Sequence, residues 1–177
     1  MDRSGQEGDV QTLNDIKPIG MDAAGYQVLQ NAVLDLLNRF PGLTDETVVF
    51  QGLTENYGMS VEPSSGALVY TESTDIVGGV HQTCQFPFFL VYRSDTSDEY
   101  QKLWITNLLD SIGAWVCREP VEVNGENVRL TEYPELSGGR KITRVTRENS
   151  YTLAPNENKT QDWVIPITVF YNHDFYY

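Results

Sequence analysis

The chain has 177 residues, 40% of them hydrophobic, and can bury roughly 70% of the surface that its unfolded form exposes, which suffices for one core. Its 12 Lys and Arg against 25 Asp and Glu give a formal net charge of −13 at pH 7. This excess of negative charge argues against a general affinity for nucleic-acid backbones or anionic lipid surfaces, because both would repel the chain.

Membrane insertion and secretion are not expected. No stretch approaches 18 uncharged apolar residues, and the first residues lack a basic segment followed by an apolar run. The two cysteines, Cys84 and Cys117, are too few for a disulfide scaffold and fall in different predicted elements. We therefore expect a reduced, cytoplasmic setting.

The first 40 residues divide into an arm and a helix. Residues 1–21 are polar and without a sustained period, so we expect an N-terminal arm whose order depends on a partner, followed by a single domain at 22–177. From the candidate N-cap Asp22, apolar residues spaced by three and four reach Phe40, which predicts a helix that ends at Pro41.

Strand signals follow. Short β-type runs at 47–51, 57–62 and 67–74, separated by turn residues, predict meander strands. The run 80–93 is apolar on both of its faces around Phe88, which predicts a central strand. Pro87 cannot donate to a ladder, so we expect a bulge or an unpaired side at that point.

A second helix is predicted from a capping box and an apolar stripe. Thr96 and Glu99 have the spacing of the box. The stripe, which we expect to lie across the sheet, contains Tyr100, Leu103, Trp104, Leu108, Ile112, Trp115 and Val116. A small peripheral hairpin, turned at Asn124-Gly125, is predicted within 117–139.

The C-terminal third contains two extended stretches, 141–153 and 163–171, which we expect to pair as a long hairpin. The second stretch is apolar on both faces and contains Pro166, so both of its faces need cover, which suggests a neighbouring molecule. The predicted fold class is therefore α+β: a mixed, mostly antiparallel β-sheet flanked by two main helices, with a long C-terminal β-hairpin.

We find no pattern that predicts catalysis, a metal or a cofactor. His81 and Cys84 are the nearest candidate zinc ligands, but residues three apart on a strand point to opposite faces. Nucleophilic catalysis by either cysteine would need an adjacent base, and we expect His173 to lie near a frayed terminus. The glycine pairs at 78–79 and 138–139 lack phosphate-loop spacing and predict turns.

One basic cluster stands out in this acidic chain: Arg140, Lys141, Arg144 and Arg147. Strand alternation places Arg140 and Arg144 on one face, and Lys141 and Arg147 on the other. The cluster has two interpretations, a solvated strand edge whose charge discourages aggregation, or a docking site for an acidic surface of a neighbouring subunit.

Aromatic residues are concentrated at the C-terminal end of the sequence. Phe175, Tyr176 and Tyr177 have no evident reason to be buried within a monomer. We expect them to contact a neighbour.

The order of these elements, with the segment Phe88-Phe89-Leu90-Val91-Tyr92-Arg93, the Trp104/Trp115 helix and the last strand from Trp163 to Asn172, resembles the tail terminator (tail-completion) proteins of long-tailed phages over about residues 22–172. The resemblance implies a ring of six subunits on the last ring of the tail tube, which stops tube growth and offers a docking surface for the head. It implies no catalytic or cofactor residues. Residues 1–21 and 117–139 depart from the family pattern.

The partners that the resemblance implies are other copies of the chain, the tail-tube protein and a head–tail connector or stopper protein. The location would be the tail or neck of the virion, after assembly in the host cytoplasm. DNA would pass through an acidic lumen without specific binding. Alternatives are another neck component, such as a head-completion, stopper or minor capsid protein, a small hydrolase or ligand-binding domain, or a monomeric adaptor.

Overall fold

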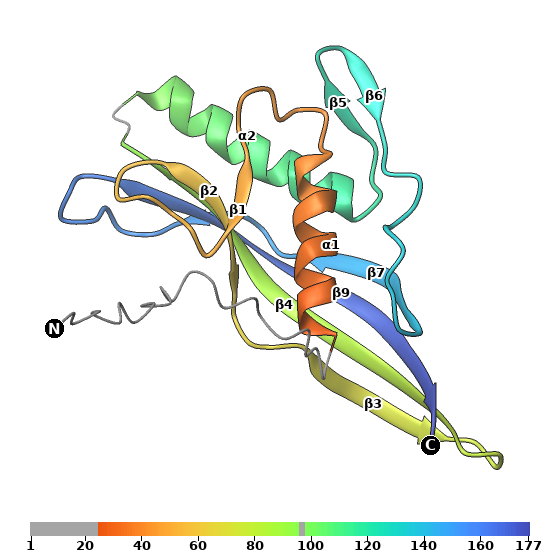
Figure 1. Cartoon of the computed structure of the whole chain (residues 1–177). Coiled ribbons are helices and arrows are strands. Elements are labelled where there is room, and N and C mark those ends of the chain that lie inside the picture. The colour runs from red at the N-terminus through yellow and green to blue at the C-terminus, as the bar shows by residue number, and fades with distance from the viewer. Residues whose placement is uncertain (1–24, 96–97) are drawn as a thin grey trace, which may run out of the picture.

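The computed structural model describes residues 25–95 and 98–177, in which two helices pack on one face of a seven-stranded sheet (Figure 1). The helices are α1 (Tyr26–Asn38) and α2 (Glu99–Val116). The sheet contains β1 (Val48–Phe50), β2 (Gly58–Pro63), β3 (Leu68–Thr74), β4 (Gly79–Ser94), β7 (Arg140–Arg147), β8 (Tyr151–Thr152) and β9 (Gln161–Tyr176). A separate hairpin contains β5 (Val121–Val123) and β6 (Glu126–Val128).

The long strands β4 and β9 form the centre of the sheet, paired antiparallel over all 16 residues of each. The strand order is β1-β2-β4-β9-β7, with β3 also on the edge of β4 and β8 also on the edge of β9. Only the β1–β2 pair is parallel among the described strands. The predicted fold class, including the C-terminal hairpin, is confirmed.

The predicted meander is wrong. Strands β2 and β3 run in the same direction along one edge of β4, with Pro63 opposite Phe88 and Leu68 opposite Gln85. The turn between β2 and β3 therefore moves the chain further along the same edge of β4 and does not reverse its direction. Strand β1 is parallel to β2, so the first three strands make no consecutive hairpin.

Both central prolines lie where an edge partner changes. The O atom of Pro87 accepts from the backbone of Ser64, in the gap between β2 and β3. The O atom of Pro166 accepts from the backbone of Glu148, in the gap between β7 and β8. Because the N and O atoms of one strand residue point to the same side, each missing N–H faces a gap in the ladder. Of the two alternatives expected at Pro87, the regular β4–β9 register shows no bulge, and the missing N–H lies on the side where the ladder is interrupted.

The core lies between the helices and one face of the sheet. Its sheet side consists of the even-numbered residues of β4 from Cys84 to Tyr92 and their partners on β9. The rings of Phe40, after α1, and Trp115, in α2, meet edge to face at 5.5 Å. The buried residues of the two helices follow helical spacing: Leu29, Ala32, Val33, Leu36 and Leu37 in α1, and Ile105, Leu108, Leu109, Ile112, Gly113, Trp115 and Val116 in α2.

Part of the predicted α2 stripe is wrong, because Tyr100, Leu103 and Trp104 are exposed. Residues 105, 109 and 112 set the buried face, and at about 100° per residue Tyr100 and Leu103 point away from it. Trp104 lies at the border of this face, where its ring meets that of Tyr92 edge to face at 6.1 Å. The N-cap is Asp98, whose carboxylate accepts from the backbone N–H of Tyr100 at 3.0 Å. Thr96, expected in the capping box, lies outside the described residues.

Helix α1 begins at Tyr26, after Gly25 in a left-handed conformation with φ of 71°. The expected N-cap, Asp22, lies outside the described residues, as does the expected arm at 1–21. The predicted hairpin turn at Asn124-Gly125 is confirmed, since both residues have positive φ, as a tight two-residue turn requires. None of the helices in the described ranges is long and apolar enough to cross a lipid bilayer.

Candidate functional site: an uncovered sheet face and a β-arm

The face of the sheet opposite the helices, here called the open face, presents apolar side chains. It consists of the odd-numbered residues of β4, the even-numbered residues of β9 and their neighbours. Neither helix lies on it (Figure 1). Val91 and Val164 are buried at one end, whereas Pro87, Phe89, Pro166 and Phe170 are half-buried. The prediction that β4 and β9 are apolar on both faces is confirmed, and the described helices cover only one of them.

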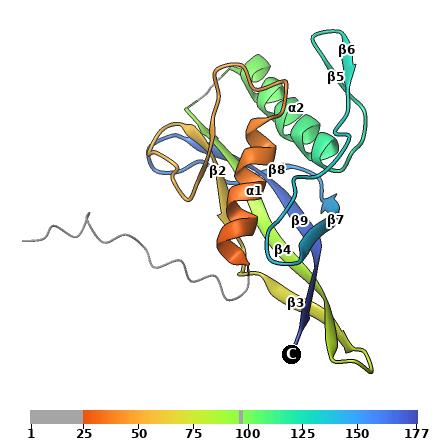
Figure 2. The ribbon, with the colours of Figure 1, turned by 45° about the vertical axis from the view of Figure 1, so that its right-hand side comes forward.

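The sheet continues past α1 as a projection of β3 and the adjoining ends of β4 and β9, here called the β-arm, made of residues 68–85 and 170–177 (Figure 2). At its base, residues 170–173 also pair with β7. All residues of β3 are exposed. At the tip, the side chains of Ile76 and Val77 are 104% and 76% exposed. Exposed apolar side chains at the end of a projection are typical of a surface that contacts another molecule.

The tip has a defined conformation. The carboxylate of Asp75 accepts from the backbone N–H groups of Val77 at 2.9 Å and Gly79 at 2.8 Å. These two bonds, that of Gly79 being the larger cause, lower the pKa of Asp75. The backbone N–H of Tyr177 donates to the O atom of Gly78 at 3.3 Å, which joins the end of β9 to the turn.

The basic cluster divides between the two faces in a different way from that predicted. Ile142 pairs with Tyr171 and Arg144 pairs with Phe170, so Thr143 is an extra residue in β7. This bulge reverses the alternation after residue 142. Arg140 and Arg147 therefore lie on the helix face, while Lys141 and Arg144 lie on the open face. The predicted pairing of Arg140 with Arg144, and of Lys141 with Arg147, is wrong.

The two inward arginines pack against the helices. The Cδ and Nε atoms of Arg140 lie so close to Gly25 that a Cβ at this position would be within 2.6 Å of both. The Cδ atom of Arg147 approaches Gly113 in α2, and its Nη2 atom lies 3.4 Å from a carboxylate oxygen of Glu119. Both side chains are thus packed within the monomer, and the Nε atom of each is buried without a hydrogen-bond partner among the described residues.

The two outward basic residues are available on the open face. Lys141 and Arg144 are exposed. The guanidinium carbon of Arg144 lies 4.2 Å from the ring centre of Phe170, close enough for a cation–π contact. In the described ranges, no carboxylate lies within ion-pair distance of either residue. Of the four basic residues, these two could meet an acidic partner.

The C-terminal aromatic residues belong to the β-arm. Strand β9 continues to Tyr176, opposite Gly79, so the expected end at residue 171 is wrong, and His173 lies within a paired strand. The ring of Phe175 is half-buried between His173 at 5.0 Å and Tyr177 at 5.9 Å. Tyr176 and Tyr177 are 75% and 90% exposed, as a contact surface requires.

His81 links the two acidic residues of the β-arm on the open face. Its Nδ1 atom lies 3.0 Å from a carboxylate oxygen of Asp174, and its Nε2 atom 3.6 Å from one of Asp75. The hydrogen bond to Asp174 is the main cause that raises the pKa of His81, and Asp75 adds to it. On the helix face, burial and the nearby Arg140 lower the pKa of His173.

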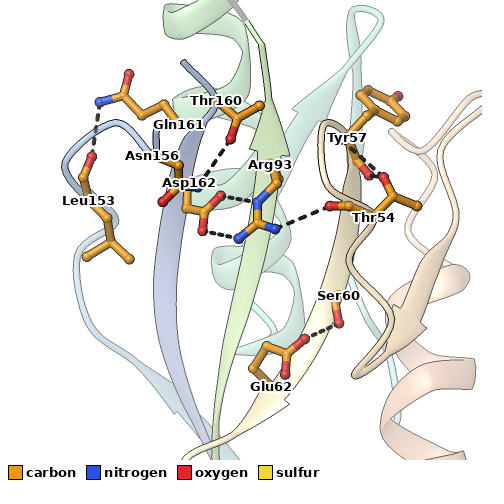
Figure 3. Close-up of polar contacts among 10 residues, drawn as sticks. All are labelled: Thr54, Tyr57, Ser60, Glu62, Arg93, Leu153, Asn156, Thr160, Gln161 and Asp162. Carbon is orange, nitrogen blue, oxygen red and sulfur yellow. Dashed lines mark hydrogen bonds and ion pairs between the residues drawn. The ribbon is translucent and has the colours of Figure 1, made fainter. Parts of the chain in front are cut away.

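At the other end of the open face, Arg93 of β4 and Asp162 of β9 form a two-armed ion pair (Figure 3). The Nη1 atom of Arg93 also donates to the O atom of Thr54 at 3.2 Å, which holds the loop before β2. The carboxylate raises the pKa of Arg93. The open face therefore ends, on this side, at an ion pair that joins β4, β9 and the loop before β2.

The groups that could support chemistry are separated. The regular β4–β9 register places His81 on the open face and Cys84 in the core, so the expected opposite orientation is confirmed. A small hollow on the helix side of the β-arm is lined by Cys84 and His173, but burial raises the pKa of the thiol and no hydrogen bond joins the two. Within 25–95 and 98–177, no three His, Cys, Asp or Glu residues form a group that could hold a metal ion.

Comparisons with known proteins give structural likeness but no family. No protein-family model matches the sequence, and no curated protein matches it. Among solved structures, a chain of a "Virion of native gene transfer agent (GTA) particle" aligns with a TM-score of 0.40 and 17% identity, over 85% of this chain and 92% of that chain. This likeness is too low to assign a role to the chain.

Proposed function

We propose that this chain is a structural virion protein that assembles with copies of itself into a ring, which caps the head-proximal end of a phage tail tube. The ring ends tube growth and provides the surface to which the head docks. The observation that carries the proposal is the combination of an apolar open face with a projecting β-arm whose tip exposes Ile76 and Val77.

These surfaces favour self-assembly because a monomer leaves both of them in water. Burying apolar surface contributes roughly 25 cal/mol per Å², so contact between them is favourable. The tip and the open face are different surfaces at different places on the chain. Contact between unlike surfaces is heterologous and forms a closed ring when the rotation between copies permits it.

The order of elements supports the tail-terminator assignment. A helix, a long central strand, a second helix and a long last strand occur in the expected order, although the meander that also belonged to the resemblance does not form. The net charge of −13 agrees with a channel through which DNA passes without binding.

The first test is the oligomeric state of the purified chain, measured by native mass spectrometry and light scattering over a range of concentrations. The proposal expects one closed oligomer. A chain that stays monomeric at all concentrations, alone and with tail-tube protein, would contradict it.

The second test separates a tail terminator from another neck component. Tail-tube protein is polymerised with and without the chain, and tube lengths are measured by negative-stain electron microscopy. A terminator shortens the tubes and labels one end. If the chain leaves tube length unchanged and binds a head connector, the head-completion or stopper alternative replaces this proposal.

A further inference from the structure

We infer that the tip of the β-arm of one copy packs on the open face of a second copy, beside β7. The inference rests on the proposed self-assembly and identifies the two surfaces that make it. One is the tip, residues 72–77 and 174. The other is the part of the open face between Pro166 and Phe170 of β9, with Lys141 and Arg144 of β7.

The tip is apolar at its end and acidic at its sides. Ile76 and Val77 are exposed. Three acidic residues lie in the same part of the β-arm: Asp75 in the turn, Asp174 on the open face and Glu72, opposite Gln82, on the helix face. His81 lies within ion-pair distance of Asp75 and Asp174 and can balance part of their charge. Glu72 is exposed and accepts a hydrogen bond from Gln82, so its negative charge is not neutralised within the arm.

The receiving surface has the complementary composition. Pro166, Thr168 and Phe170 are half-buried along β9, and Arg144 lies over the ring of Phe170. Lys141 and Arg144 have no carboxylate within ion-pair distance among the described residues. Apolar contact would supply the attraction, and the charges would set the orientation of the arm.

The contact must join two molecules. Gly79 follows the tip turn and Phe89 lies near the centre of the open face, ten residues further along the same strand. At about 3.3 Å per residue they are roughly 33 Å apart. Because β4 is paired along its length, the arm cannot fold back onto its own sheet. Each copy therefore offers a tip to one neighbour and a face to another.

Charge reversal tests the inference. Two variants reverse the tip (E72K/D174K) and the face (K141E/R144E), and a third combines all four changes. All four side chains are exposed, so circular dichroism and thermal unfolding should show folded proteins. We expect each double variant to weaken self-association by about tenfold or more, and the quadruple variant to restore it, because the charges are then exchanged. The substitution I76S/V77S should also weaken self-association, and the face variant K141E/R144E should not restore it.

The matched control is E122K/E126K on the β5–β6 hairpin, which changes the net charge as much as the tip variant does at two exposed positions elsewhere. It should leave self-association unchanged. If the tip and face variants behave like this control while the parent chain still forms its oligomer, the inference is overturned and the proposed function stands. A parent chain that never self-associates overturns both.

Cross-linking identifies the occupant of the open face. A benzophenone amino acid at Thr168 of the full chain is irradiated and the products are mapped by mass spectrometry. Cross-links to residues 75–77 of a second copy are expected. Cross-links to residues 1–24 of the same chain, or in assembled particles to a different protein, would overturn the inference because another segment would then occupy the face.

Discussion

Arg93 and Asp162 lie opposite each other in the β4–β9 ladder, and their side chains form two parallel hydrogen bonds of 2.7 Å, from Nε to Oδ1 and from Nη2 to Oδ2. The side chains are only 22% and 11% exposed. A pair with this geometry is expected to contribute more than a typical surface ion pair, since solvent screens it little.

Asp162→Ala should therefore lower the free energy of unfolding by about 2–3 kcal/mol, because it leaves a largely buried guanidinium without its carboxylate. The measurement is urea denaturation at neutral pH. The control is Glu99→Ala, which removes an ion pair with Lys102 in which the glutamate side chain is 79% exposed, and should cost within about 0.5 kcal/mol. Equal effects of the two substitutions would contradict this prediction.

The two histidines should titrate on opposite sides of their ordinary pKa of 6.5. Asp174 raises the pKa of His81, and burial lowers that of His173. A pH titration followed by NMR measures both, and H81A and H173A assign the signals, since the chain has two histidines. Asp174→Asn should bring the pKa of His81 back towards 6.5. Two pKa values on the same side would contradict the placement of these rings.

These shifts have opposite consequences for stability. The contribution of His81 is fully present below its unfolded pKa and is lost as the pH rises through its raised folded value. The contribution of His173 is present above pH 6.5 and is lost as the pH falls through its lowered folded value. Thermal unfolding of H81A and H173A, measured between pH 4 and 9, should show the His81 contribution disappearing towards the alkaline end of this range and the His173 contribution disappearing towards the acidic end.

Gly139→Ala should destabilise the fold more than Gly138→Ala. Both glycines have φ of 70°, which costs about 1 kcal/mol for alanine. At Gly139 the added Cβ would also lie 2.4 Å from the backbone O atom of Asp174, which cannot move away, whereas at Gly138 it would meet the Arg140 side chain. We expect a loss at least about twice as large at Gly139, measured by chemical denaturation. Equal losses would show that the backbone contact adds nothing.

Asp98→Ala should cost about 1 kcal/mol, because Asp98 is the N-cap that accepts from Tyr100. Asp98→Asn, which retains a capping oxygen, is the matched control and should be close to the parent. The measurement is the midpoint of thermal unfolding. If Asp98→Ala has no effect and Thr96→Ala does, the capping box read from the sequence is correct and the cap seen in the structure is not.

The two-sided character of β4 and β9 was predictable from sequence, because strand residues alternate between faces and both alternate sets are apolar. The α2 stripe was only partly predictable. Its first members, Tyr100 and Leu103, keep approximate helical spacing but extend away from the buried face, with Trp104 at the border. Only packing against the sheet selects which of two overlapping stripes is buried.

The candidate assembly residues were identified by composition, but the sheet face on which each of them lies was not. Thr143, the bulge residue in β7, donates its hydroxyl to the O atom of Phe170, and nothing in the local sequence distinguishes it from a regular strand residue. One extra residue places the side chains of all later residues in the strand on the opposite face of the sheet. Ile76 and Val77 were missed, because a short apolar pair beside Gly78 reads as part of a turn.

The acidic character, the α+β class and the approximate positions of the long strands follow from the sequence, because they depend on composition and on local periodicity. The folded chain was needed to show that both helices lie on one face, that Arg140 and Arg147 point inwards, and that Lys141 and Arg144 point outwards beside Phe170. The reason is physical: the order of strand pairing and the position of a bulge depend on contacts between segments far apart in the chain, and local spacing carries no record of them.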